Sequence, residues 1–366
     1  MRLAVGIFGL SVGCGPSSLD KACDPGEVCV IAGTGELGFN GDDGSATALR
    51  LASPTAVKVS PDGVIHVVDY SNMRVRVLHD DGDLETVVGS GFHAYSEIGA
   101  ASLDTPLENP VDVAWLPDGT LCVLPQHEGR LICVASDNTI DLRVGTGEIE
   151  DRGDGGAATE ANLGYTGGVA VLPSGEIYIT DQSHSRVRMV DRQGIISTVL
   201  GVGSAGLGSD GYGPEVALRF PERVVYDTNG ARLLVSDAGN HRVVAMDLET
   251  LEVVTIIGTG VAGFSGDGGP ATAASVNRPT DVVPTPEGGL LISDTRNHRI
   301  RYVDPDGMVS TVAGSGERGH VARPLERLEA PVDGPAGMTL TDDGDLLIAA
   351  QFGHTVLRVR QLVDEL

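Results

Sequence analysis

The sequence repeats itself about every 56 residues, and this period restricts the possible folds more than any other feature. A glycine that ends a short β-branched segment recurs at Gly33, Gly89, Gly145, Gly201, Gly258 and Gly314. A second marker keeps the same register at Pro54, Pro110, Thr166, Pro221, Pro279 and Pro335. The 366 residues are therefore six copies of one unit, whereas length alone suggests two or three separate domains.

Each unit has the pattern of four short antiparallel strands. In the fifth unit we expect strands at 280–284, 290–293, 299–303 and 309–313, separated by Asp-, Asn-, Gly- and Pro-rich turns. The chain has 51 glycines and 19 prolines, which supply such turns and disfavour long helices. Four strands per unit and six units predict an all-β, six-bladed β-propeller over residues 28–366.

The two ends of the chain are expected to meet in the last blade. The sixth unit supplies segments 338–341, 346–349 and 356–360 and then ends before a fourth strand. Residues 28–33 match the fourth-strand sequence of the fifth unit, at 310–314. We therefore predict that the N-terminal strand completes the sixth blade, which removes an open sheet edge.

The repeats also carry a family resemblance. Residues 263–274 read GFSGDGGPATAA, and the Asp294 turn follows with Asn297, His298 and Arg299. This pattern resembles NHL-repeat propellers, including those of teneurins, over about residues 28–360. The resemblance implies the propeller fold. It does not select one function, because such propellers include protein-binding modules, RNA-binding modules and an amidating lyase.

The first residues are typical of an export signal. Met1-Arg2, a short apolar run from Leu3 to Leu10 and small residues before Cys14 indicate a secretory signal of the lipoprotein kind. We expect residues 1–14 to be the signal with a lipid on Cys14, and residues 15–27 to be a tether. Plain secretion and a misplaced start are the alternatives. The expected location is the cell envelope or the exterior, with membrane contact only through the lipid.

Export gives the remaining cysteines a role, since disulfides persist in oxidising compartments. Cys23 and Cys29 flank a turn, and a bridge between them would brace the expected ring closure. Cys122 and Cys133 lie on two adjacent predicted strands at matching distances from their turn, which predicts a second bridge. Buried free thiols are the alternative for that second pair.

The net charge excludes one broad class of partner. The chain has 25 basic and 51 acidic residues, a formal charge of −26. A surface this acidic repels phosphate backbones, so we expect no nucleic-acid binding.

The long connections between units define the expected binding face. They share one face with the turns between the second and third strands, whereas the opposite face has only tight turns. Four of these connections contain a Gly/Asp cluster, which would suit either calcium or ordinary turn chemistry. The acidic residues are Asp42, Asp154, Asp210 and Asp267. Connections 89–110 and 314–335 lack the cluster.

Two recurrent patterns are interpreted as structural. An Asp–Arg pair flanks the second turn in four units, and recurrence favours a turn-bracing salt bridge over a catalytic acid: Asp69/Arg74, Asp181/Arg186, Asp237/Arg242 and Asp294/Arg299. Four histidines are placed at one equivalent turn position: His184, His241, His298 and His354. Because the other histidines, among them His93 and His127, are not expected to gather, the sequence disfavours a zinc site.

Charged residues at the start of the inner strands are the candidate ligand site. Asp112, Arg223 and Asp281 occupy equivalent places, and Glu222 adjoins Arg223. These four residues are expected to border the channel mouth, where they would bind a small polar ligand or a cation. The alternative is a solvated pore edge with internal ion pairs.

The functional hypothesis is a binding scaffold of the cell envelope that recognises a protein, peptide or glycan through the long-loop face. A metal-dependent propeller enzyme, a lyase or lactonase with its site at the channel mouth, is the alternative. No nucleophile triad or nucleotide loop is recognisable, so we favour a role without catalysis. No cofactor is expected apart from the calcium considered above.

Overall fold

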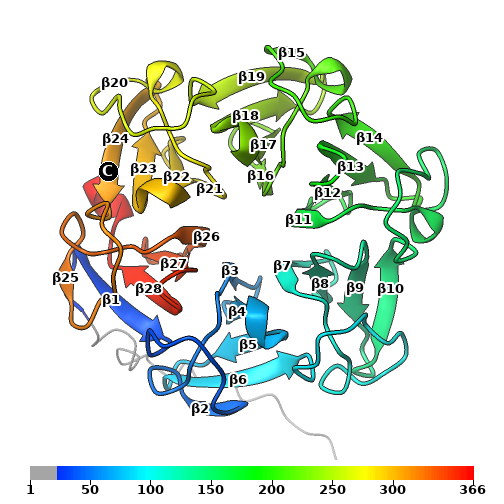
Figure 1. Ribbon diagram of the computed structural model, residues 1–366, viewed down its shortest axis with the longest axis horizontal. Helices are drawn as coiled ribbons and strands as arrows, with labels where there is room; N and C mark the ends of the chain where they lie inside the picture. The colour runs from blue at the N-terminus through cyan, green and yellow to red at the C-terminus, as the bar shows by residue number, and fades with distance from the viewer. Residues whose placement is uncertain (1–22) are drawn as a thin grey trace, which may run out of the picture.

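The computed structural model describes residues 23–366, and it is a closed ring of six antiparallel sheets (Figure 1). The predicted six-bladed, all-β propeller is confirmed. The expected signal, Cys14 and most of the tether lie outside the described residues. Strand β1 begins at Glu27, and Cys23 is buried ahead of it.

Each blade contains four main strands, ordered from the channel outward. Blades 1 and 2 contain β3 (Ala56–Val59), β4 (Ile65–Asp69), β5 (Arg74–Leu78) and β6 (Asp83–Val88), then β7 (Pro110–Trp115), β8 (Leu121–Pro125), β9 (Leu131–Val134) and β10 (Ile140–Val144). Blades 3 and 4 contain β11 (Thr166–Val171), β12 (Ile177–Asp181), β13 (Arg186–Val190) and β14 (Ile196–Leu200), then β16 (Val224–Asp227), β17 (Arg232–Asp237), β18 (Arg242–Asp247) and β19 (Glu252–Ile257). Blades 5 and 6 contain β21 (Val282–Pro284), β22 (Leu290–Asp294), β23 (Arg299–Val303) and β24 (Met308–Ala313), then β26 (Pro335–Leu340), β27 (Leu346–Ala350), β28 (Thr355–Val359) and β1 (Glu27–Ala32).

Four blades gain a fifth, very short strand that the sequence did not predict. It comes from the connection between blades and pairs with the outermost strand, which covers part of an exposed sheet edge. These strands are β2 (Asp43–Ser45), β15 (Gly211–Tyr212), β20 (Gly269–Pro270) and β25 (Leu325–Glu326). The only helices of the described chain are short 3-10 turns, at 70–72, 158–160, 213–215, 238–240, 271–273, 295–297 and 363–365.

The predicted ring closure is confirmed. Strand β1 pairs antiparallel with β28, with Val28 opposite Val359, so the blue and red ends of the chain lie side by side in Figure 1. Both predicted disulfides are present. Cys23 bonds to Cys29 next to the closure, and Cys122 bonds to Cys133, its direct partner across β8 and β9.

The core lies between neighbouring blades. Buried aliphatic side chains from one blade pack on those of the next, as Leu124 and Leu131 of blade 2 do with Val169 and Ile179 of blade 3. Burial of this apolar surface stabilises every blade interface, so each blade depends on its neighbours.

Three histidines join blades by a hydrogen bond to the backbone. Nδ1 of His241, His298 and His354 accepts the amide of Arg278, Gly334 and Ser53, respectively, at 3.1–3.2 Å. Each of the three has a positive φ of 52–54° and lies directly before the third strand of its blade. The expected equivalence of His184 is wrong.

In blade 3 the equivalent residue is Ser185, with a φ of 50°. His184 instead takes the place of Asn240, and its ring contacts Asp181 at 2.9 Å as Asn240 contacts Asp237 at 2.8 Å. The histidine of blade 3 therefore lies one position earlier in its turn than His241 does in blade 4, and this gives it a different structural role.

We expect His354→Ser, which copies the residue of blade 3, to lower the free energy of unfolding by about 1 kcal/mol at pH 8, because the Ser53 amide loses its acceptor. Burial lowers the pKa of His354 from its ordinary value of 6.5, so folding favours the neutral ring. The stabilisation is present above that value and is lost as the pH falls through it, since an imidazolium cannot accept the bond. Urea unfolding should show that the free energies of unfolding of wild type and His354→Ser differ less at pH 5 than at pH 8. A gap that widens on acidification would contradict this role, and exposed His320→Ser is the control.

Candidate functional site

A cavity opens at the channel mouth on the loop face. Its volume is about 310 Å³, and it is bordered by the starts of the inner strands and by the turns between the second and third strands. Its lining includes Tyr70, Gln126, Phe220, Glu222, Arg278 and Phe352. Residues from five of the six blades therefore converge on one concave surface, which is the usual form of a ligand site.

A chain of hydrogen bonds runs around this mouth. The Tyr70 hydroxyl donates to Oε1 of Gln126 at 2.6 Å, and Nε2 of Gln126 donates to Oε1 of Gln182 at 3.1 Å. Gln182 in turn donates to Glu222 at 2.7 Å, and Arg278 donates to the other oxygen of Glu222 at 2.9 Å. Five consecutive units contribute one residue each, so the polar rim is fixed in position.

Four of the five rim residues were not predicted from the sequence: Arg278, and three residues that share one position of the repeat. Tyr70, Gln126 and Gln182 occupy one place in the repeat, directly after the second strand, where the other units have Ala238, Thr295 and Gln351. In four blades this position lines the loop-face cavity, and the polar residues there were the available signal. Burial, with the nearby Glu222 and Glu108 charges, raises the pKa of Tyr70 to about 12, so its hydroxyl remains a donor.

A buried ion network closes the channel below the mouth. One Arg223 guanidinium nitrogen donates to the carbonyls of Thr55 and Val111 at 2.8 and 3.0 Å, and the other donates to the carbonyl of Gly167 at 2.9 Å. Arg223 also lies 3.1 Å from the Asp112 carboxylate, which Lys58 approaches at 2.9 Å. This single side chain of blade 4 thereby joins blades 1, 2 and 3.

Asp281 extends the network to the remaining blades. Its carboxylate accepts the amides of Val282 and Met338, the latter from blade 6 at 2.7 Å. Burial raises the pKa of Asp281 to about 6, although Arg223 and Lys58 oppose that shift. Two carboxylates and two cations thus balance one another inside the channel, between the loop-face cavity and an apolar cavity of about 460 Å³ on the opposite face.

The four charged residues expected at the channel mouth do not share one rim. Glu222 and Arg223 line the loop-face cavity, and Asp281 lines the cavity of the opposite face. Asp112 is fully buried between them, and Arg223 and Asp281 are buried too, so these three residues do not form a solvated edge. The internal ion pairing expected in that alternative is present, because Arg223 lies 3.1 Å from Asp112. The inner strands start at the rim but descend into the channel within two residues, which places these side chains below it.

The four Gly/Asp loops are not brought together. Asp42, Asp154 and Asp267 lie in different blades and pair with arginines of their own blade: Arg74 at 2.9 Å, Arg188 at 2.6 Å and Arg301 at 2.7 Å. Asp210 accepts a bond from Thr255 at 2.7 Å. Arginines balance three of these charges, which agrees with the turn role, and calcium binding there stays a prediction.

The Asp–Arg pairs brace the second turn, but the expected pairing holds in two blades only. Asp237–Arg242 and Asp181–Arg186 lie at 2.8 and 3.7 Å. In blades 1 and 5 the buried aspartates instead face the arginine two residues further along, as in Asp69–Arg76 and Asp294–Arg301 at 3.6 and 3.4 Å. That arginine lies on the same side of the strand as the first, because side chains two residues apart share a face.

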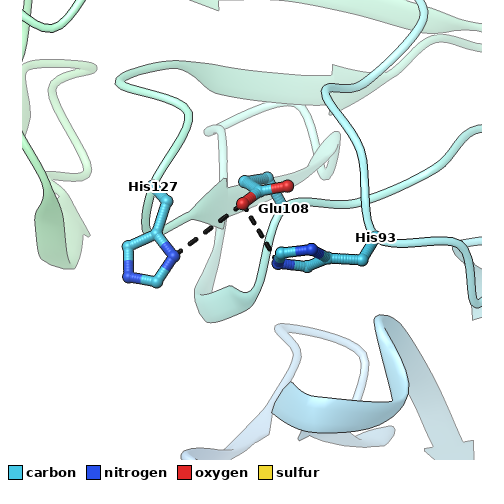
Figure 2. A group of neighbouring side chains, drawn as sticks. All are labelled: His93, Glu108 and His127. Carbon is cyan, nitrogen blue, oxygen red and sulfur yellow. Dashed lines mark ion pairs between the residues drawn. The ribbon is translucent and has the colours of Figure 1, made fainter.

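Two histidines and a glutamate meet on the loop face, which corrects the sequence analysis. Nε2 of His93 lies 3.0 Å from Oε1 of Glu108, and Nδ1 of His127 lies 3.9 Å from the same oxygen (Figure 2). The three ligand atoms lie within 4.8 Å of one another. His93 and His127 were not expected to gather, because they are 34 residues apart in different connections and only the tertiary fold places those connections together.

Exposed apolar side chains are concentrated on the connections between blades. Of the eighteen large apolar side chains exposed in the described residues, fourteen lie on these connections. They are Leu37, Phe39, Phe92, Tyr95, Ile98, Leu103, Ile149, Tyr165, Val202, Leu207, Tyr212, Val261, Phe264 and Leu328. Grouped exposed apolar side chains on one side of a molecule are typical of an interaction surface.

We expect Arg223→Leu to lower the free energy of unfolding by about 3–5 kcal/mol, because it leaves Asp112 buried without its partner. Arg192→Leu removes an exposed pair with Glu176 and should cost no more than about 1 kcal/mol. Urea unfolding followed by fluorescence of Trp115, the single tryptophan, measures both variants. Equal effects of the two substitutions would show that the channel network does not hold the ring together.

Comparisons with known proteins agree with the fold. The family description of the teneurin NHL domain matches residues 138–210. Teneurin-m of Drosophila melanogaster is 27% identical over 362 residues, which cover 88% of this chain and 12% of that protein. NHL repeat-containing protein 2 of Bos taurus is 26% identical over 294 residues, which cover 72% of this chain and 40% of that protein. The chain thus spans less than half the length of these relatives.

Solved structures give the same fold at low sequence identity. An auxiliary nutrient binding protein from Bacteroides thetaiotaomicron superposes with a TM-score of 0.67 at 14% identity, covering 91% of this chain and 75% of the other. A gluconolactonase from Xanthomonas campestris superposes with a TM-score of 0.57 at 12% identity, covering 94% and 95%. Among the described residues, no helix has the length and apolar character needed to cross a membrane. The chain is therefore a six-bladed β-propeller whose repeats are similar to those of the teneurin NHL domain and of NHL repeat-containing proteins.

Proposed function

We propose that this propeller is a binding protein that recognises a protein or peptide through its loop face. The observation that carries the proposal is the concentration, on the connections between blades, of fourteen of the eighteen large apolar side chains exposed in the described residues. The hydrogen-bonded rim adds fixed polar groups at the centre of that surface. An apolar surround with a few fixed polar contacts suits protein recognition.

A peptide or protein is favoured over a glycan as the occupant. Aromatic platforms for sugar rings are sparse here, and the single tryptophan, Trp115, lines the cavity of the opposite face. Most of the fourteen exposed side chains are aliphatic or phenylalanine, which contact apolar peptide side chains well. One solved propeller of this fold is described as a nutrient binding protein, which agrees with a binding role.

An enzyme at the channel mouth, of the lyase or lactonase kind, is the weaker candidate. No histidine lines the loop-face cavity among the described residues. Its carboxylate, Glu222, accepts bonds from Gln182 and Arg278, so the Arg278 cation already balances its charge. A solved gluconolactonase shares the fold, but a shared fold does not by itself carry the activity.

A random peptide library displayed on phage tests the binding proposal. Selected peptides should bind wild-type protein and bind at least tenfold more weakly to Leu207→Ser/Val261→Ser, which removes two exposed side chains of neighbouring loops. Val254→Ser is the matched control, since Val254 is 50% exposed but lies on the outer strand β19. The proposal would be overturned if Val254→Ser lost as much peptide affinity as the double variant. It would also be overturned if the protein bound a glycan array and selected no peptide.

We also propose that the protein is exported and anchored by a lipid on Cys14, since the two disulfides suit an oxidising compartment. Cells given radioactive palmitate should label the wild-type protein in the membrane fraction. Cys14→Ser should remove the label and release the protein from that fraction. Label retained by Cys14→Ser would contradict the anchor.

A further inference from the structure

We propose that His93, Glu108 and His127 form a binding site for one divalent transition metal ion of the zinc class, with a coordination position left open. The site goes beyond the proposed peptide recognition and does not depend on it. Figure 2 shows the two imidazoles approaching the same carboxylate from opposite sides. The ligand atoms are Nε2 of His93, Oε1 of Glu108 and Nδ1 of His127.

The backbone holds His93 and Glu108 next to each other. Both belong to the connection between β6 and β7, where His93 and Leu107 form a parallel bridge. The Leu107 amide donates to the carbonyl of Phe92 at 3.2 Å, and the Leu107 side chain is fully buried. The backbone therefore places these two ligand side chains next to each other.

The third ligand is fixed by a buried glutamate beside it. His127 lies in the turn between β8 and β9, and the next residue, Glu128, is fully buried. Glu128 accepts the amide and hydroxyl of Ser96 at 3.1 and 2.8 Å and a bond from Arg130 at 3.1 Å. Because Ser96 belongs to the β6–β7 connection, Glu128 ties that connection to the turn that carries His127.

The distances suit a tetrahedral ion. Ligand atoms about 2.1 Å from zinc are separated by about 3.4 Å in a tetrahedron. The observed separations from Glu108 are 3.0 Å to His93 and 3.9 Å to His127, each within about 0.5 Å of that edge. The third separation is no more than 4.8 Å, so a small rotation of one imidazole completes the geometry.

The donor types select the kind of ion. Two imidazole nitrogens and one carboxylate oxygen suit zinc, nickel or copper, whereas calcium and magnesium prefer oxygen alone. Neither ring nitrogen of His127 makes a hydrogen bond within the described chain, although the ring packs 4.7 Å from Tyr165. In the metal-free protein Nε2–H of His93 donates to Oδ1 of Asn109 at 2.7 Å, so this nitrogen must lose that proton and hydrogen bond when it binds the ion.

The cluster lies where the chain departs from its own repeat. The β6–β7 connection lacks the Gly/Asp cluster, and the turn after β8 reads PQHEGR where blade 5 has DTRNHR. His127 thus replaces the exposed Arg296, and Glu128 replaces Asn297. The other blades fold without these residues, so the histidines are not needed for the propeller itself.

The site is open to an external ligand. The side chains of His93 and His127 are 53% and 35% exposed, while Glu108 is 15% exposed. Three protein ligands leave the fourth tetrahedral position for water or an incoming side chain. His127 directly follows Gln126 of the cavity rim, so the ion would lie beside the loop-face cavity.

Calorimetric titration of the untagged, metal-free full chain with zinc chloride tests the proposal. Wild type should bind one zinc ion, and His93→Ala, His127→Ala and Glu108→Gln should each bind at least tenfold more weakly. His79→Ala is the matched control, because His79 and Glu85 form an exposed pair at 3.1 Å outside this site. The proposal would be overturned if the wild-type protein bound no zinc, or if the control His79→Ala lost as much zinc affinity as His127→Ala.

Cobalt(II) gives an independent readout of the same site. The wild-type protein should develop the intense visible absorption of tetrahedral cobalt, and His127→Ala should not. Circular dichroism should show both proteins equally folded without metal, since His127 is partly exposed. Spectra typical of octahedral cobalt in wild type would contradict the three-ligand site. Phage selection of peptides carried out without metal tests the proposed binding function separately from this metal site.

Discussion

The pairing of β1 with β28 is the constraint on which the rest of the structure depends. Without β1 the sixth blade would end at β28, whose unpaired backbone groups would form an open sheet edge, and the pairing with β1 covers that edge. Here the ends are 337 residues apart where Arg360 donates to the carbonyl of Cys23, and the adjacent disulfide fixes the same corner. Closure lets every blade bury apolar side chains against two neighbours.

Closure also creates the channel, and the chain fills that channel with charge. Arg223 reaches the carbonyls of three other blades, and Asp112 and Asp281 balance it with Lys58. A charge removed from water is costly unless it is fully paired, so these residues specify one arrangement of the six blades. They separate the two mouths, which leaves the loop-face cavity as a surface for binding rather than as the entrance to a pore.

Structural and candidate functional residues separate along the repeat. Positions that recur, such as the turn aspartates and His241, His298 and His354, bind their own turn or the next blade. Positions that vary, such as Tyr70, Gln126 and His127, surround the mouth or carry the histidine cluster. The recurrent positions stabilise each of the six units, so the residues at the loop face can differ from one unit to the next.

The sequence by itself determined the number of blades, the ring closure and both disulfides. Each follows from spacing along the chain, because a fixed period sets which strands are adjacent and Cys122 and Cys133 are at matching distances from one turn. Only the tertiary structure determined how deeply each side chain is buried and in which direction it points. Spacing placed Asp112 and Arg223 near a mouth, but the curvature of the ring buried them.

The same limit applies to the candidate sites. The Asp–Arg partners of blades 1 and 5 differ from those expected because the first arginine binds elsewhere. Arg74 pairs with Asp42, and Arg299 donates to the carbonyls of Asn297 and Ser315. His93, Glu108 and His127 meet because the β6–β7 connection is tied to the next turn through Ser96 and Glu128. Sequence periodicity locates equivalent positions within units, whereas contacts between unlike positions of neighbouring units exist only after the ring has closed.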